Sequence, residues 1–267
     1  MVFHKGKVLL IVTGASRGLG RALTECFCDR FIASHSEVTK NENAMLTLLL
    51  LARNAQLLSE VRATIESKSP QINVFDALVG DLSLESTQDA FEKSLQKIND
   101  EFDEAIIIHN AGTVGDPNQL VDSFTLQDSQ FIKSYFECNV FSVIKMTSAF
   151  LRKFASKAKH CTIVNISSLA AVKAIKGLSI YGAGKAARDA YFRSVALEME
   201  NTSVLNYAPG PLQTEMVDIL KKEGFNKEFF KEEKNLLKPE STIKKLFNLL
   251  ETGNYENGSH VDVFDIQ

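Results

Sequence analysis

The sequence has few of the features that mark secreted, membrane-spanning or nucleic-acid-binding proteins. It contains only four cysteines, with no C-x-x-C spacing and no neighbouring pair of histidines, which argues against a zinc site or a disulfide framework. A net charge of −3 provides no general attraction to nucleic acid or to an acidic membrane. The longest apolar run, Met45 to Ala52, is too short to span a bilayer. We therefore expect no resident metal and no nucleic-acid or membrane partner.

The remaining bulk properties indicate a globular protein of the cytoplasm. The first residues lead directly into an apolar segment and show no signal-peptide pattern, and reduced thiols are the simplest state for the four cysteines. With 267 residues, of which 45% are hydrophobic, the chain can bury a sizeable core. Length and composition permit one large α/β domain or two small ones.

A glycine-rich turn follows the first predicted strand. The apolar run Val8 to Val12 is typical of a strand buried on both faces, and it leads into a Thr-Gly-Ala-Ser-Arg-Gly-Leu-Gly turn and a helix to about Phe31. Gly14 would allow the tight turn, Gly18 the approach of a pyrophosphate and Gly20 close helix packing. This order of elements predicts dinucleotide binding, although the spacing is one residue longer than the usual fingerprint.

The residues after the second predicted strand favour NADPH over NADH. The strand runs from Leu46 to Ala52, and its tip carries Arg53 where an NAD site usually holds an acidic residue. Arg17 in the glycine turn could join Arg53 around a 2′-phosphate, whereas the alternative is that both are solvated surface charges. The polar stretch from Ser34 to Asn43 is interpreted as an exposed loop.

Strands and helices alternate along the first half of the chain. A helix from about Ala55 to Glu66 precedes a strand at 72–78, and a helix near 84–98 precedes a strand at 105–108. Asp81 would either accept a hydrogen bond from an adenine amino group or cap the following helix. This alternation predicts an α/β fold with a doubly wound parallel sheet, flanked by helices on both faces, whose ligands lie at the carboxyl ends of the strands.

The second half holds a serine, a tyrosine and a lysine that suit carbonyl chemistry. Tyr181 and Lys185 are four residues apart in a predicted helix, so both side chains project from one face. The ammonium is expected to pull the phenol pKa toward neutrality, where the group can exchange a proton. Ser168, after the strand at 161–166, could hold a carbonyl oxygen nearby. The bland alternative is a solvated tyrosine beside a surface lysine.

Three further segments of the second half have open interpretations. Asn139 lies in a largely apolar helix, about Ser129 to Phe154, and is either a structural hydrogen-bond hub or part of an active-site network. The charged segment from Lys221 to Lys238 is either a lid or an ordinary solvated helix. After the strand near 203–207, Pro209-Gly210-Pro211 forms a rigid turn, and the chain closes with a helix near 241–250 and a strand near 260–264.

Taken together in this order, the motifs at 13–20, 110–112, 139, 168, 181, 185 and 209–210 resemble those of the short-chain dehydrogenase/reductase family over essentially the whole chain. The resemblance implies a single Rossmann-type domain over residues 1–267, with a cofactor half at about 1–125 and a catalytic and substrate half at about 126–267. It also implies an NADPH/NADP cofactor and a homodimer. The catalytic set that it implies is Asn139, Ser168, Tyr181 and Lys185. The implied cofactor contacts are Gly14, Ser16, Arg17, Gly18, Leu19, Gly20, Arg53, Asn54, Asp81, Leu82, Asn110, Ala111, Gly112, Tyr181, Lys185, Pro209, Leu212, Thr214 and Met216.

A narrower resemblance is to members of the family that reduce a carbonyl group on the side chain of a pterin. It covers residues 165–169, 181–189, 204–212 and 260–262, and it fits poorly at 34–43 and 217–238. It implies that Ser168, Tyr181, Gly210 and Asp262 contact the substrate, with Asp262 accepting hydrogen bonds from the pterin ring. Without the family, Asp262 would be taken for a solvent-facing residue. The alternatives are a broad dicarbonyl or quinone reductase and a catalytically idle NADPH-binding regulator.

Overall fold

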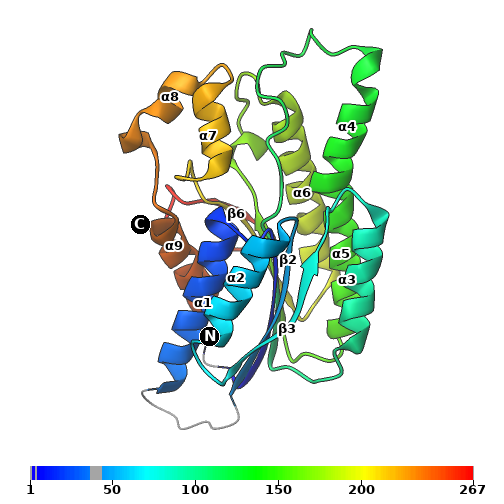
Figure 1. Ribbon diagram of the computed structural model, residues 1–267, viewed down its shortest axis with the longest axis vertical. Coiled ribbons are helices and arrows are strands. Elements are labelled where there is room, and N and C mark those ends of the chain that lie inside the picture. Colours follow the sequence, from blue (N-terminus) through cyan, green and yellow to red (C-terminus); the bar gives the residue numbers. More distant parts are fainter. Residues whose placement is uncertain (1, 4, 37–43, 267) are drawn as a thin grey trace.

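A seven-stranded parallel sheet forms the centre of the computed structural model, which describes residues 2–3, 5–36 and 44–266 (Figure 1). The strand order is β3-β2-β1-β4-β5-β6-β7, and the direction of winding reverses between β1 and β4. The predicted doubly wound parallel sheet is confirmed. The strands are β1 (Lys7–Thr13), β2 (Met45–Ala52), β3 (Ile72–Val79), β4 (Glu104–His109), β5 (Cys161–Ile166), β6 (Thr202–Ala208) and β7 (His260–Asp262).

Helices cover both faces of the sheet, as Figure 1 shows. One face packs against α1 (Gly18–Ser36), α2 (Ala55–Glu66) and α9 (Pro239–Thr252). The other packs against α3 (Glu85–Lys97), α5 (Ser142–Phe154) and α6 (Ser179–Glu198). Because both faces are covered, the central strands are continuous apolar runs, and Val8 to Val12 are completely buried. None of the helices among the described residues is long and apolar enough to cross a membrane.

Several element boundaries differ from the sequence-based expectations. Helix α1 extends to Ser36, so the start of the expected loop at 34–43 is helical, and residues 37–43 lie outside the described residues. Two contacts extend the helix: the Ser34 hydroxyl donates to the Phe31 carbonyl at 2.8 Å, and the buried His35 ring lies 2.8 Å from the same oxygen. The final strand β7 ends at Asp262, two residues before the expected end.

The long helix expected at 129–154 is divided by a wider turn. It consists of α4 (Ser129–Phe136), a π-helical segment (Glu137–Phe141) and α5. A π turn inserts one extra residue into the helical repeat, which changes the direction of the side chains that follow and often marks a functional position. Asn139 lies in this segment and is buried.

The charged segment at 221–238 is ordered and packs against two loops. It contains the end of α7 (Glu215–Lys222), α8 (Lys227–Lys231) and a 3₁₀ turn (Glu233–Asn235). The Gly224 N–H donates to Asn118 Oδ1 at 2.9 Å, and Asn226 Nδ2 donates to the Lys176 carbonyl at 2.9 Å. Figure 1 shows α7 and α8 beyond the carboxyl ends of the strands. The segment is therefore more than a solvated helix, and it adjoins the predicted site.

Candidate active site

The predicted site residues gather at one edge of the sheet, here called the carboxyl edge because the strands end there. All seven strands contribute. Five neighbours, β1, β4, β5, β6 and β7, end at Thr13, His109, Ile166, Ala208 and Asp262, and the other two, β2 and β3, lead to Arg53 and Asp81. Parallel neighbours place the segments that follow them side by side. The glycine turn, the segment at 110–112, the serines at 167–168 and the Pro-Gly-Pro turn therefore line a common edge.

The glycine turn has the geometry of a pyrophosphate cradle. Gly14 and Gly18 have φ values of 70° and 52°, a region that glycine reaches without strain. A Cβ atom on Gly20 would stand 2.1 Å from the Gly14 carbonyl oxygen, so α1 begins directly against the turn. A tight turn, glycines without side chains and a helix N-terminus are the features that bind phosphate groups. The residues present therefore fit a dinucleotide.

Hydrogen bonds fix the segment after β4 against the glycine turn. Asn110 Nδ2 donates to the carbonyl oxygens of Thr13 at 3.0 Å and Gly14 at 3.3 Å. The Thr13 hydroxyl oxygen accepts from the backbone N–H groups of Asn110 at 3.1 Å and Ala111 at 3.0 Å. At Gly112, a Cβ atom would stand 2.8 Å from Asn139 Oδ1. These contacts join the two strand ends at the switch point into one rigid wall.

The two arginines expected to recognise a 2′-phosphate lie on the surface at this edge. Arg17 contacts Glu215, and Arg53 faces Asp81 with 3.7 Å between Nη1 and Oδ2. Their side chains are 53% and 67% exposed, so each guanidinium has donors open to solvent. Asn54, beside Arg53, caps α2 by accepting from the Leu57 N–H at 2.9 Å.

Asp81 shapes the turn after β3. Its Oδ1 accepts from the Ser83 N–H at 2.9 Å and from the Ser83 hydroxyl at 2.8 Å. Burial tends to raise the pKa of Asp81, but these bonds and the charge of Arg53 bring it below its ordinary value. The N-cap of α3 is Leu84, so the alternative in which Asp81 caps this helix is wrong.

The other expected cofactor contacts lie on both sides of the glycine turn. Ser16, Leu19 and Leu82 are buried. The Thr214 methyl group lies 3.6 Å from the Cβ position of Gly18, which places the segment after β6 beside the turn. Pro209, Leu212 and Met216 belong to the same part of the chain. The Pro209 carbonyl accepts a hydrogen bond from the Thr242 hydroxyl at 3.0 Å, Leu212 is buried, and Met216 packs in the apolar cluster that includes Tyr181.

Ser168, Tyr181 and Lys185 meet at the carboxyl edge. Ser168 caps the 3₁₀ helix Leu169–Ala171 and hydrogen-bonds the Tyr181 phenol. Lys185 is buried; its Nζ donates to the Ile166 carbonyl at 2.6 Å and lies 5.7 Å from the centre of the Tyr181 ring. The non-catalytic alternative, a solvated tyrosine beside a surface lysine, is therefore wrong. A hydroxyl donor, a phenol and a cation around one point suit proton transfer to a carbonyl oxygen.

The electrostatics of Tyr181 differ from the expectation that Lys185 would bring its pKa toward neutrality. Burial raises the pKa of Tyr181, while the Ser168 hydrogen bond and the positive charge of Arg188 lower it. Burial also lowers the pKa of Lys185 far below its ordinary value, and Arg188 lowers it further. The expectation failed because it counted the lysine charge alone and left out the cost of burying both groups.

Asn139 is a hydrogen-bond hub between two segments of the site. Its Nδ2 donates to the Tyr135 carbonyl at 2.9 Å, and its Oδ1 accepts from the Thr113 N–H at 2.9 Å. The side chain therefore holds the π-helical segment to the loop after β4. These contacts show the structural role considered from the sequence, and a part for Asn139 in an active-site network stays a prediction.

Asp262 is buried at the end of β7 and belongs to the same edge as Ser168. Its Oδ1 accepts from the Phe264 N–H at 3.0 Å, whereas Oδ2 has no hydrogen bond with the described part of the chain. Its strand lies two positions from β5, which corresponds to about 10 Å across the sheet. Gly210 has a φ of 78° and packs against Val263 and Leu237.

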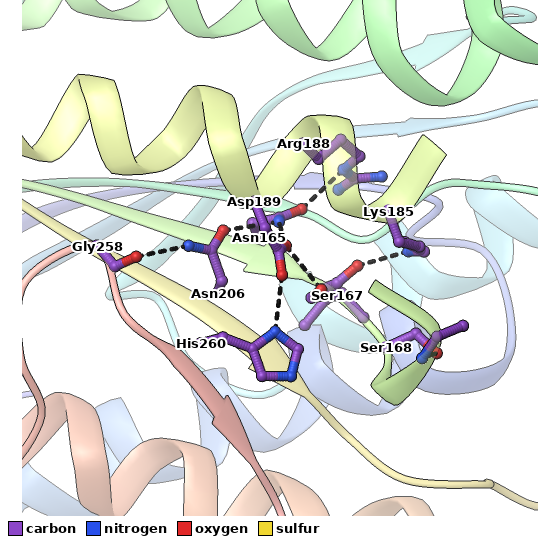
Figure 2. Close-up of polar contacts among 11 residues, drawn as sticks. Asn165, Ser167, Ser168, Lys185, Arg188, Asp189, Asn206, Gly258 and His260 are labelled. Atoms are coloured by element: carbon purple, nitrogen blue, oxygen red, sulfur yellow. Dashed lines mark hydrogen bonds and ion pairs between the residues drawn. The ribbon is translucent and has the colours of Figure 1, made fainter. Parts of the chain in front are cut away.

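A buried polar network behind these residues was missed by the sequence analysis. Asn165 Nδ2 donates to Asp189 Oδ1 at 2.9 Å and to Asn206 Oδ1 at 2.8 Å (Figure 2). Ser167 donates to Asp189 at 2.7 Å, and His260 Nδ1 lies 2.7 Å from the other Asp189 oxygen. The signal was present in the sequence, since Asn165 and Asn206 interrupt apolar strands and a buried amide needs partners.

The parallel sheet, the phosphate-binding turn and the Ser168, Tyr181 and Lys185 cluster define an oxidoreductase that uses a nicotinamide nucleotide. The short chain dehydrogenase family model matches residues 8–224. The chain belongs to the short-chain dehydrogenase family.

Relatives are similar to the chain over nearly its full length. Sepiapterin reductase of Xenopus tropicalis is 32% identical, with 97% of each chain covered, and sepiapterin reductase of Rattus norvegicus is 31% identical, with 98% of each covered. Benzil reductase ((S)-benzoin forming) of Bacillus subtilis is 28% identical over 96% of this chain and 98% of the relative. Among solved structures, the KRED1-Pglu enzyme has a TM-score of 0.75 and 25% identity, covering 95% of this chain and 99% of that one.

Proposed function

We propose that this protein is an NADPH-dependent carbonyl reductase that acts on the side chain of a pterin, as sepiapterin reductase does. The observation that carries the proposal is the buried carboxylate of Asp262 at the same sheet edge as Ser168 and Tyr181. The similarity to sepiapterin reductases across 97% of the chain supports it. In this proposal residues 1–267 form one domain, with the cofactor half and the catalytic half meeting at the carboxyl edge.

The cofactor is held by the glycine turn and the wall beside it. NADPH, when bound, supplies the hydride that the reduction requires. The N–H groups at the start of α1 hold the pyrophosphate, and Arg17 and Arg53 hold the 2′-phosphate through exposed guanidinium donors. Two solved structures of the same fold, 22% and 21% identical to this chain, are complexes with NADPH and NADP, respectively.

The catalytic residues of the chain hold the carbonyl oxygen and provide its proton. Ser168 donates a hydrogen bond to the oxygen as negative charge develops there, and Tyr181 transfers its phenolic proton to that oxygen. Lys185, already held by the Ile166 carbonyl, stays beside the phenol as it becomes phenolate. Asn139 fixes the π-helical segment against the loop after β4.

Asp262 anchors the ring of the substrate. A pterin presents an exocyclic amino group and a ring N–H side by side, which a carboxylate accepts in bidentate fashion. Oδ2 of Asp262 is available for such a bond, and Oδ1 has a second lone pair beyond its bond from Phe264. About 10 Å separates strands two positions apart, a span that suits a bicyclic ring with its carbonyl side chain at Ser168. Gly210 lines the site of the ring through its backbone.

The experiment is to compare wild type with Asp262→Asn on two substrates, sepiapterin and benzil. Asparagine keeps the acceptor for the Phe264 N–H and removes the charge, so folding should be preserved. Losing a charge-assisted bond costs about 1.5–3 kcal/mol, so kcat/KM for sepiapterin should fall about ten- to hundredfold. Turnover of benzil should change little, and NADH should support less activity than NADPH.

A second candidate function is a dicarbonyl reductase of broad specificity. The 28% identity to a benzil reductase over 96% of the chain favours it. Under this alternative Asp262→Asn would leave kcat/KM unchanged on every substrate. Activity on benzil with none on sepiapterin would establish it, with Ser168, Tyr181 and Lys185 keeping the same roles.

We also propose a homodimer in the cytoplasm. Phe141, the last residue of the π-helical segment, and Val172, beside α6, are 45% and 62% exposed, which leaves apolar side chains open to solvent. A groove of about 570 Å³ adjoins Val172 and continues along Ala183 and Ala186 of α6. A second copy of the chain covers this face. Light scattering of wild type and Val172→Asp tests this, since only the wild type should have twice the mass of one chain.

A further inference from the structure

Arg188 is a buried cation on the helix that carries the catalytic tyrosine and lysine. It follows Tyr181 by seven residues and Lys185 by three, so all three side chains project from one face of α6. Only 1% of Arg188 is exposed. A buried charge is costly unless its donors are satisfied, so the partners of this guanidinium indicate what it stabilises.

The guanidinium binds the ends of two central strands. Its Nη2 donates to the carbonyl oxygen of His109, the last residue of β4, at 2.7 Å, and its Nη1 lies 3.5 Å from the carbonyl oxygen of Ala111. Its Nε donates to Oδ1 of Asn165 in β5 at 2.7 Å. The segment at 110–112 and the serines at 167–168 begin at these strand ends. One side chain therefore ties the cofactor wall and the catalytic serine to the helix of Tyr181.

The positive charge of Arg188 is not neutralised by a direct ion pair. The nearest carboxylate in sequence, Asp189, is bound instead by Asn165, Ser167 and His260. Asn165 stands between the two charges, accepting from Arg188 and donating to Asp189, as Figure 2 shows. Within the described ranges, no carboxylate forms an ion pair with Arg188. The charge of Asp189 favours the cation through space, and the charge of Arg188 in turn acts on Tyr181 and Lys185.

Several titratable groups surround this charge from different elements. Burial lowers the pKa of Arg188 to about 10, so it remains a cation at neutral pH. Its charge lowers the pKa values of Tyr181 and Lys185. The other groups that face the cluster are Tyr135 of α4, Cys138 of the π-helical segment, His109 of β4, Asp189 of α6 and His260 of β7.

We propose that Arg188 is a positioning residue that joins the ends of β4 and β5 to the catalytic helix and holds a permanent positive charge behind Tyr181. The charge favours the phenolate that Tyr181 becomes after it gives its proton. Lys185 is then free to bind the Ile166 carbonyl and the cofactor, because Arg188 supplies a charge that stabilises the phenolate. The inference rests on the proposed function in one respect, namely that Tyr181 is the proton donor.

The test is a titration of Tyr181 in protein without substrate or cofactor. Tyrosine carrying ¹³C at its phenolic carbon reports ionisation by NMR, and Tyr181→Phe assigns the resonance. Arg188→Met and Arg188→Gln remove the charge, the latter keeping a donor for the His109 carbonyl. Arg193→Met is the matched control, because Arg193 lies on the exposed side of the same helix. Arg188→Lys keeps the charge but cannot bind both strand ends.

In the neutral variants the Tyr181 midpoint should rise by about 0.5–1 pH unit, because a cation close to the phenol lowers its pKa. Arg193→Met and Arg188→Lys should titrate as wild type, while Arg188→Lys should reduce kcat on benzil about tenfold through lost positioning. An unchanged midpoint in a folded neutral variant overturns the electrostatic role. If neither neutral variant folds, Arg188→Lys provides the test. A kcat on benzil equal to that of wild type overturns the proposal, whereas a reduced kcat with an unchanged Tyr181 midpoint supports it.

The titration needs no substrate, so its result is separate from the identity of the substrate. A shifted midpoint with no turnover of sepiapterin would retain Arg188 and reject the pterin. Turnover of sepiapterin with an unshifted midpoint would support the pterin substrate and reject the electrostatic role of Arg188.

Discussion

The contact between Gly20 and Gly14 leads to a prediction that sets helix propensity against packing. From helix propensity alone, Gly20→Ala should stabilise the protein by about 1 kcal/mol. Here the new methyl group would stand 2.1 Å from the Gly14 carbonyl oxygen and 2.5 Å from Asn110 Nδ2. Backbone cannot rotate away as a flexible side chain can, so the turn and the start of α1 must separate.

The magnitude follows from these two opposing effects. Overpacking costs about 1–3 kcal/mol, and contact with backbone places the cost at the upper end. After subtracting the gain in propensity, about 2 kcal/mol of destabilisation remains, which lowers Tm by about 4–8 °C in a chain of this size. Because the displaced N–H groups are those that we propose hold the pyrophosphate, NADPH should bind about ten- to hundredfold more weakly, the equivalent of one charge-assisted bond.

Thermal unfolding and calorimetric titration with NADPH measure both effects on the same sample. Gly253→Ala is a suitable control, because Gly253 has a φ of 67° with no atom within 4 Å of its Cβ position. It should cost stability through backbone strain and leave NADPH affinity unchanged. A Gly20→Ala protein that melts higher than wild type and binds NADPH equally well would refute the packing argument.

Three further predictions concern buried side chains. Burial, and then the charge of Arg188, hold the pKa of His109 well below 6.5. Because His109 takes up a proton in the unfolded chain but not in the folded one, the free energy of unfolding should fall by about 1 kcal/mol between pH 7 and 5.5. Urea unfolding of His109→Asn should show a smaller dependence of this free energy on pH. Tyr207→Phe removes a hydroxyl that lies 2.9 Å from the Thr242 carbonyl and should cost about 1–2 kcal/mol, measured by the same unfolding experiment. Tyr181→Phe should abolish turnover in a protein that unfolds at the same urea concentration as wild type, whereas retained turnover would remove Tyr181 from the mechanism.

Much of the fold could be predicted because local patterns and tertiary packing agree. Continuous apolar runs such as Val8 to Val12 can be buried on both faces only in a covered parallel sheet, and the alternating helices supply that cover. The boundaries were less predictable. The start of the polar stretch at Ser34 continues α1, because contacts of Ser34 and His35 with the Phe31 carbonyl outweigh the polar composition.

For the candidate site, the sequence could indicate which residues lie at the carboxyl edge of the sheet, but not their contacts. Spacing placed Tyr181 and Lys185 on one helical face, and the family resemblance placed Ser168 and Asp262 at the substrate. Spacing could not show that Lys185 binds the Ile166 carbonyl, nor that burial raises the Tyr181 pKa. Those outcomes depend on the surroundings of each charge, which residues far apart in the chain provide.

The sequence by itself determined the alternation of strands and helices, the phosphate-binding turn and the set of reactive side chains, because these follow from local periodicity and short-range geometry. Only the tertiary structure decided which polar groups are buried together. Arg188, Asn165 and His109 lie on three different elements, and their contacts form only when the sheet closes against α6. The energy of a buried charge is a property of its whole environment, and no stretch of sequence contains that environment.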